Sequence, residues 1–577
     1  MAKWLGVVAS LFATACATGP AIAARGAAPA YDILIRGGTI YNGSGGVPFV
    51  GDVGIRGDRI VYAGPPQRAT APRIVEAAGL AVAPGFINML SWSNESLLVD
   101  PRGQSDLRQG VTLEVMGEGW SMGPVNDRMK VLAVKQQGDI KYPIQWTTLG
   151  DYLSFVEHKG TALNIASFVG ATTVRQHELG DNDVDPNPVQ LDRMRALVRQ
   201  AMKEGAMGVA SSIIYPPASF AETDELVALA TEAGKCGGMY ISHMRSEGDR
   251  LIESVDELIE ISRRSGAPAE IYHLKQAGRA NWGKLDQVIA KVEAGRASGL
   301  RITADMYTYT AGGTGVAASM PPWVQAGGTD AMLKRLKDPA IIERIKREMV
   351  MPGTNWENLY YHAGPDGILL SNLTEASLKP LIGKTIAQVA KERGTSPEQV
   401  VIDIVLADQG RAGAVYFLMN EQNVRRQTAI PWMSFGSDAE ASAPEGVFLK
   451  SSTHPRAYGN FARFLGKYVR DEKTTTLADA VRRLTSLPAT NLGLRDRGRI
   501  AAGTAADVVV FDPATIADHA TYERPRQYAT GVRDVLVNGV QVLRGGEPTG
   551  ATPGRIVKGP GWTGWPNGGA CRRDKKG

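Results

Sequence analysis

Residues 237–249, GGMYISHMRSEGD, and residues 269–278, AEIYHLKQAG, decide the fold. Each stretch holds a short apolar run that ends in a histidine, His243 in the first and His273 in the second. Residues 250–265, which separate them, carry apolar side chains at the spacing of a helix. This order predicts a strand, a loop, a helix and a second strand, with a histidine closing each strand.

Parallel strands that alternate with helices and carry polar residues at their carboxyl ends indicate the active-site face of a (β/α)₈ barrel. Further strands are expected at the end of residues 81–88 and at residues 109–116, 163–169, 207–214, 301–307 and 433–437. Each histidine could instead be a hydrogen-bonded residue near the core. Because two of them close successive strands, the pattern favours a metal ion with nitrogen ligands.

The two ends of the chain carry similar β patterns. Short alternating strands broken by Gly-Gly, Asn-Gly and Gly-Asp pairs occupy residues 31–64, and matching segments return at residues 497–513 and 532–546. We therefore expect residues 31–85 and 495–550 to form one composite β domain. The barrel, residues 86–494, would be inserted into it, with a tail at residues 551–577. Within the barrel, helical patterns predict an inserted subdomain at about residues 315–426, and residues 476–492 are expected to form the helix that closes the barrel.

Composition excludes several classes of protein. The chain has 577 residues, of which 43% are hydrophobic and 21% are charged, a composition typical of a globular protein. Its formal net charge of +5 is too small for its length to indicate a nucleic-acid-binding protein. Nothing after the N-terminus resembles a transmembrane segment, and the oligomeric state does not follow from the sequence.

The N-terminus resembles a secretory signal peptide. Lys3 precedes an apolar run at residues 4–15, and Ala21-Ile22-Ala23 is a cleavage pattern, so residues 1–23 predict export to the periplasm or the medium. Cys16 suggests lipid anchoring as an alternative, which residues 13–15 disfavour. The mature chain would keep only Cys236 and Cys571, a pair so distant in sequence that it does not indicate a disulfide framework.

A series of motifs in fixed order carries a family resemblance. APGFIN, QGVT, GEG, YISHMRSEGD, IYHLKQAG, TADMYTYTA, GSDA, HPRAYGNFARFLGKYVR and GTAADVVVFDP resemble the D-aminoacylase branch of the amidohydrolase superfamily, from about residue 31 to residue 557. The resemblance implies a (β/α)₈ barrel inserted in a composite β-sandwich domain, and a zinc-dependent amide hydrolase site.

Two departures from the family pattern concern the metal. The family's His-x-His pair after the first strand is replaced by Leu90 and Trp92, which cannot bind zinc, so we expect the first metal position to be absent and one zinc per chain. The second position in the family uses a cysteine and two histidines. His243 and His273 match the histidines, and Glu118, at or beside the place of the cysteine, is the expected third ligand.

The resemblance also implies roles for three other residues. Asp438 matches the catalytic aspartate, although an Asp after Gly-Ser is also a common helix cap. Arg456 matches the arginine that binds the substrate α-carboxylate, and Tyr307 the tyrosine that assists it; the alternatives are a surface salt bridge and a core aromatic. Lys275, two residues after His273, could face the pocket, but it is expected to be a solvated loop residue.

Together with these residues, the resemblance implies a zinc hydrolase that removes the acyl group from N-acyl-D-amino acids or similar linear amides. The zinc would activate a water, and Asp438 would accept its proton. One alternative is a hydrolase of another amide, such as a D-residue-containing peptide or a cyclic imide; another is a catalytically inactive binding protein. The preferred acyl group, the side chain and the choice between D and L substrates do not follow from the sequence.

Overall fold

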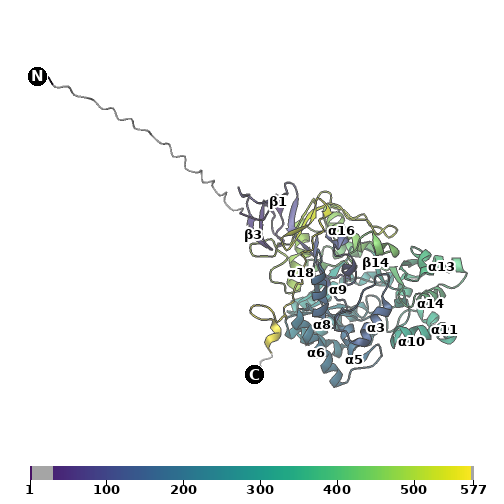
Figure 1. Ribbon diagram of the computed structural model, residues 1–577. Helices are drawn as coiled ribbons and strands as arrows, with labels where there is room; N and C mark the ends of the chain where they lie inside the picture. Colours follow the sequence, from purple (N-terminus) through teal and green to yellow (C-terminus); the bar gives the residue numbers. More distant parts are fainter. Residues whose placement is uncertain (3–29, 574–577) are drawn as a thin grey trace.

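The computed structural model describes residues 1–2 and 30–573 of the chain (Figure 1). The expected signal peptide, with Cys16, lies almost wholly outside the described residues. Among the described residues, no helix is both long and apolar enough to cross a membrane.

The centre of the molecule is a closed barrel of eight parallel strands. The strands pair in chain order: β6 (Phe86–Asn88), β7 (Val111–Met116), β8 (Asn164–Ser167) continued by β9 (Val169–Gly170), β10 (Gly208–Ser212), β11 (Met239–His243), β12 (Ala269–Ile271), β13 (Ile302–Met306) and β17 (Met433–Phe435). The ring closes where the Met89 N–H donates to the Phe435 carbonyl over 3.1 Å and Ser91 pairs in parallel with Ala439. The expectation of a (β/α)₈ barrel is confirmed.

Helices cover the outside of this barrel. They include α4 (Leu149–Lys159), α5 (Ala171–Leu179), α6 (Pro188–Glu204), α7 (Thr223–Lys235), α8 (Leu251–Ser265) and α9 (Leu285–Ala297). In α8 the buried side chains include Leu251, Val255 and Leu258, which recur every three or four residues as expected for one face of a helix. Gly266, with a φ of 72°, ends α8 in the left-handed conformation that glycine adopts at low cost.

The two ends of the chain share one nine-stranded sheet. The N-terminal strands are β1 (Ile33–Ile40), β2 (Phe49–Arg56), β3 (Arg59–Gly64), β4 (Arg73–Glu76) and β5 (Ala81–Pro84), and the C-terminal ones are β18 (Val508–Phe511), β19 (Val532–Val537), β20 (Val540–Arg544) and β21 (Glu547–Pro548). Antiparallel pairing of β5 with β18 joins the two groups. Because β1 pairs with both β4 and β5, the sheet divides there and encloses its own apolar core.

The insertion before β17 contains the helices expected from the sequence and, in addition, a small sheet. It contains helices α10 (Gly328–Arg335), α11 (Pro339–Met349), α12 (Leu359–Ala363), α13 (Ile386–Arg393) and α14 (Pro397–Ala407), which lie together on the side of the molecule away from β3 (Figure 1). It also contains an antiparallel sheet in the order β14 (Ala311–Gly315), β16 (Gly413–Phe417) and β15 (Ile368–Asn372). β14 reads AGGTG, so it lacks the alternating apolar side chains that mark a strand.

Two expectations are wrong in detail. Residues 476–492 form two helices, α17 (Leu477–Leu484) and α18 (Ser486–Asn491), which break at Thr485, where φ is −133°. Cys236 and Cys571 form a disulfide with their Cα atoms 4.4 Å apart. In the C-terminal segment, Ile556 pairs in parallel with Ile165 of β8, so this segment is part of the packed structure.

Candidate metal centre and active site

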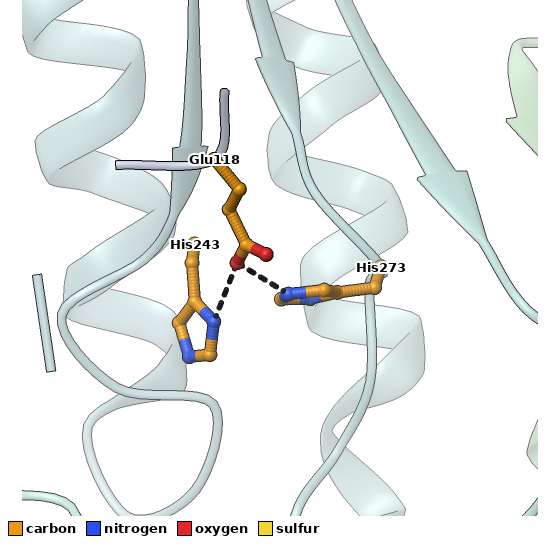
Figure 2. Close-up of side chains that lie close together, drawn as sticks. All are labelled: Glu118, His243 and His273. Atoms are coloured by element: carbon orange, nitrogen blue, oxygen red, sulfur yellow. Dashed lines mark hydrogen bonds and ion pairs between the residues drawn. The ribbon is translucent and has the colours of Figure 1, made fainter. Parts of the chain in front are cut away.

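Three buried side chains meet at the carboxyl ends of the barrel strands. Glu118 follows β7, His243 is the last residue of β11, and His273 comes two residues after β12. Glu118 Oε1 lies 3.1 Å from His243 Nδ1 and 3.0 Å from His273 Nε2 (Figure 2). The ligating atoms of the three residues all lie within 4.8 Å of one another.

Two glycines place Glu118. Gly117 and Gly119 flank it with φ values of 102° and 66°, which a side chain would strain. A Cβ on Gly117 would lie 2.4 Å from the Phe168 carbonyl oxygen, and one on Gly119 would lie 2.6 Å from the Ser212 Cβ. The GEG sequence therefore lets the loop turn sharply between two neighbouring strands and direct Glu118 toward the histidines.

The electrostatics of the centre favour a cation. Although burial opposes it, the two imidazoles hold the pKa of the Glu118 carboxyl well below its usual range. Burial and the Lys275 ammonium act to lower the pKa of His273, yet the surrounding carboxylates raise it to about 10. Two nitrogen ligands and one carboxylate match the donor set of catalytic zinc sites. The residues present therefore fit a zinc ion.

A second carboxylate, Glu247, lies on the other side of the imidazoles. Its Oε1 is 3.0 Å from His273 Nδ1, and its Oε2 is 3.5 Å from His243 Nε2. Lys275 Nζ donates to Glu247 Oε1 over 2.6 Å and lies equally close to His273 Nδ1. Carboxylates in this position fix the orientation of metal-ligating histidines. Lys275 is 7% exposed, so the expectation of a solvated lysine is wrong, because its ammonium neutralises a buried acid.

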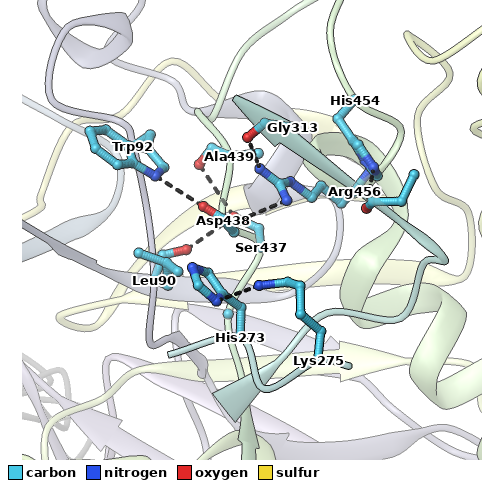
Figure 3. A network of polar contacts seen from close by, with 12 residues as sticks. Leu90, Trp92, His273, Lys275, Gly313, Ser437, Asp438, Ala439, His454 and Arg456 are labelled. Carbon is cyan, nitrogen blue, oxygen red and sulfur yellow. Dashed lines mark hydrogen bonds and ion pairs between the residues drawn. The ribbon is translucent and has the colours of Figure 1, made fainter. Parts of the chain in front are cut away.

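Asp438 lies next to this centre, three residues after β17. Its Oδ2 is 2.7 Å from Arg456 Nη1, and its Oδ1 accepts a hydrogen bond from Trp92 Nε1 over 3.0 Å (Figure 3). Burial raises the pKa of Asp438, and the Arg456 guanidinium opposes that shift. Asp438 is not the cap of a helix in this structure.

Two of the site residues have an unusual backbone conformation. His273 and Asp438 have φ values of 32° and 50°, a region that residues other than glycine rarely adopt. The His273 N–H donates to Asp305 Oδ1 over 2.8 Å, which holds its backbone in place. Such strained positions concentrate at functional sites, where the surrounding structure fixes them.

The residues expected to bind substrate line the same cavity. Tyr307 follows β13 directly, and Arg456 is the first residue of α16 (Arg456–Arg463). The Arg456 guanidinium lies 4.6 Å from the centre of the Tyr307 ring. The Tyr307 hydroxyl and Arg456 Nε are buried and have no hydrogen-bond partner within the described part of the chain. Both are therefore free to donate to a ligand.

The cavity above the metal centre has a volume of about 520 Å³. Glu118, His243, His273, Asp438, Arg456 and Tyr307 all line it, so the structure brings every predicted site residue together. The inserted subdomain also lines the cavity, with residues of β14 and β16 and with Arg411. The cavity is large enough for a small molecule and combines a metal centre with a buried cation.

Comparison with known proteins gives the family. The chain is 32% identical to the D-aminoacylase of Alcaligenes xylosoxydans xylosoxydans over 535 residues, which cover 91% of this chain and 97% of the relative. The chain belongs to the D-aminoacylase family of amidohydrolases. The family model described as an amidohydrolase family matches residues 372–543. Members of this family are hydrolases of carbon–nitrogen bonds other than peptide bonds, and this chain is such an enzyme.

Two solved structures of this family are similar to the chain. One is a D-aminoacylase with a binuclear metal centre, described as activated by one metal and attenuated by the second (TM-score 0.76, 31% identity, 92% of this chain and 100% of that chain). The other is the N-acyl-D-glutamate deacylase of Bordetella bronchiseptica, bound to zinc and to a phosphonate that mimics the tetrahedral intermediate (TM-score 0.75, 27% identity, 92% of this chain and 99% of that chain).

Sequence reasoning missed three features of this D-aminoacylase-like site. It assigned no role to Glu247, which lies four residues after His243 in the stretch that decides the fold. It took Lys275 to be a surface residue. It treated Trp92 only as a lost ligand, whereas the Trp92 side chain contacts both Glu118 and Asp438.

Proposed function

We propose that the protein is a single-zinc deacylase that hydrolyses N-acyl-D-amino acids to a carboxylic acid and a free amino acid. The observation that carries this proposal is the approach of Glu118 Oε1 to His243 Nδ1 and His273 Nε2 within a buried cavity. These three residues would hold the zinc. Because Leu90 and Trp92 occupy the family's first metal position, one zinc per chain is expected.

The bound zinc supplies a Lewis acid for the amide carbonyl and lowers the pKa of water. Asp438 is the buried carboxylate placed to act as general base. In the proposed reaction it accepts a proton from the attacking water and later returns it to the nitrogen of the leaving amine. Water is thereby added across the amide bond, and Asp438 ends in its starting state.

Arg456 and Tyr307 support a substrate with an α-carboxylate. A buried guanidinium with a free Nε–H and a neighbouring unpaired hydroxyl form a strong donor set for a carboxylate. The relatives are named for D-amino-acid substrates, which supports the choice of the D form.

The proposed location is the periplasm or the medium. The sequence of residues 1–23 supports it, and so does the Cys236–Cys571 disulfide, because disulfides persist in oxidising compartments.

The test combines metal analysis with a substrate screen. The purified protein should contain about one zinc and release amine from N-acyl-D-amino acids faster than from their L forms. Equal or better cleavage of cyclic imides would instead support the alternative amide hydrolase. A zinc-loaded protein without any amidase activity would support a binding role.

A further inference from the structure

Trp92 lies where the family resemblance puts a ligand of the first metal. The segment after β6 is fixed there, because the Trp92 N–H donates to the Ala439 carbonyl over 3.0 Å and Ser91 pairs with Ala439. Its indole Nε1 lies 3.1 Å from Glu118 Oε2. The same atom lies 3.0 Å from Asp438 Oδ1 (Figure 3). The single indole N–H is therefore shared by the expected metal ligand and the expected base.

An indole N–H can only donate a hydrogen bond, so it cannot bind a metal ion. It can, however, bridge two carboxylates, and hydrogen bonds to ionised acceptors are among the strong ones. Burial and the negative charge of Glu118 both raise the pKa of Asp438, so the two acids repel each other across this space. In a binuclear site a cation would offset that repulsion. In this chain the Arg456 guanidinium pairs with Asp438, and the Trp92 N–H is placed between the two carboxylates.

Leu90 replaces the other histidine of the family's His-x-His pair. Its side chain is fully buried, and its backbone carbonyl accepts the Asp438 N–H over 2.9 Å. A Cβ on Gly436 would lie 2.7 Å from the Leu90 Cβ, so the leucine is packed directly against the segment that carries Asp438. An apolar side chain thus fills the other place that would need to supply a ligand.

We propose that Trp92 replaces the first metal of the family with a hydrogen bond: it is a positioning residue that holds Asp438 beside Glu118 and keeps a second metal out. The positioning of Asp438 rests on the proposed function, whereas the exclusion of a second metal does not. One D-aminoacylase is described as attenuated by its second metal. We expect this enzyme, by contrast, to keep its activity in excess zinc.

The experiment compares the parent, Trp92→Phe and the double variant Leu90→His/Trp92→His. Each metal-free protein is titrated with Zn²⁺, and the bound metal is counted by elemental analysis after gel filtration. The parent and Trp92→Phe should each bind about one zinc, because phenylalanine supplies no ligand. The double variant should bind a second, and only this variant should lose activity in excess zinc.

Trp92→Phe keeps an aromatic side chain, although a smaller one, and removes the N–H. We expect kcat to fall by about 10-fold or more, the effect of losing a hydrogen bond to a charged group, with KM within about twofold. Trp323→Phe is the matched control: the Trp323 indole N–H donates to Glu348 over 2.8 Å in the inserted subdomain, and neither residue lines the cavity, so its loss should leave kcat unchanged.

Two tight zinc ions in the parent, or attenuation of the parent by excess zinc, would overturn the exclusion of a second metal. An unchanged kcat in Trp92→Phe would overturn the positioning role. If the double variant does not fold, the zinc count of the parent still decides whether a second metal is excluded. If the parent cleaves no N-acyl amino acid, the proposed function fails, while the zinc counts continue to test the exclusion.

Discussion

Arg456 Nη1 lies 2.7 Å from Asp438 Oδ2, so the residue expected to bind the substrate carboxylate is paired with the expected general base. Both side chains are buried, and the ion pair offsets the cost of holding two charges in the cavity. Because Arg456 Nε has no partner among the described residues, the guanidinium can bind a carboxylate without leaving Asp438.

Arg456→Gln should therefore have two effects. KM for an N-acyl-D-amino acid should rise by about 10- to 100-fold, because a hydrogen bond to a charged group is worth about 1.5–3 kcal/mol. The acid limb of the kcat profile should also move to higher pH, since Arg456 lowers the pKa of Asp438 and its loss lets burial raise that pKa further. Steady-state kinetics across pH measures both.

The control for this prediction is a substrate whose α-carboxylate is amidated. Its KM should be high in the parent and change little in Arg456→Gln. If both substrates lost affinity equally, Arg456 would act through the structure of the cavity and not through the carboxylate.

Glu118→Ala should weaken zinc binding by about 10-fold or more, because removing a direct ligand should cost at least as much as removing a residue that orients one. Competition with a chelator measures this. Glu440→Gln is a matched control, since Glu440 lines the same cavity but is not part of the cluster of metal-ligating side chains. Full zinc occupancy in Glu118→Ala under chelator challenge would require another third ligand.

Glu247→Gln tests whether the Glu247 carboxylate orients the two histidines for metal binding. The variant removes a charge that faces His273 Nδ1 and Lys275 Nζ, so the imidazole keeps at most a neutral amide acceptor in place of a carboxylate. We expect zinc affinity to fall by about 10- to 100-fold while one zinc per chain still binds at saturation. Unchanged affinity would mean that Lys275 and the backbone hold His273 without the carboxylate.

The disulfide predicts a loss of stability on its removal. The Cys236→Ser/Cys571→Ser double variant should be less stable by about 2–5 kcal/mol, since the bond constrains two residues that are 335 positions apart. Thermal unfolding without reductant measures the change as a lower Tm. The parent isolated from an oxidising compartment should contain no free thiol at these positions; two reactive thiols there would contradict the bond.

Much of the barrel could be predicted because its signal is local. His243 and His273 each end an apolar run, and the helix between them has regular spacing, so two units of the fold are visible in 42 consecutive residues, 237–278. β14 could not be predicted, because three of its five residues are glycine and its pairing partner lies about 100 residues later.

The site was predictable as a set of residues but not as a set of contacts. A family pattern identifies Asp438 and Arg456 separately, yet their ion pair depends on how α16 packs against the carboxyl end of β17. The same holds for Trp92, whose replacement of a histidine is visible in the sequence. That its N–H reaches two carboxylates depends on three loops meeting at one point.

Asp438→Asn separates the base from the metal. The change is nearly isosteric and removes the proton acceptor, and the side chain makes no hydrogen bond or ion pair with His243 or His273 within the described chain. General acid–base catalysis typically contributes about 10²- to 10⁴-fold, so kcat should fall by at least about 10²-fold while zinc and fold are retained.

His243→Ala should instead lose zinc and activity together. Amine release from a substrate that the parent cleaves, measured with the zinc content of each sample, distinguishes the two. Near-normal turnover in a zinc-loaded Asp438→Asn protein would remove Asp438 from the role of base. Glu247 would then be the next candidate, because it is a buried carboxylate beside the histidines and is not one of the expected zinc ligands.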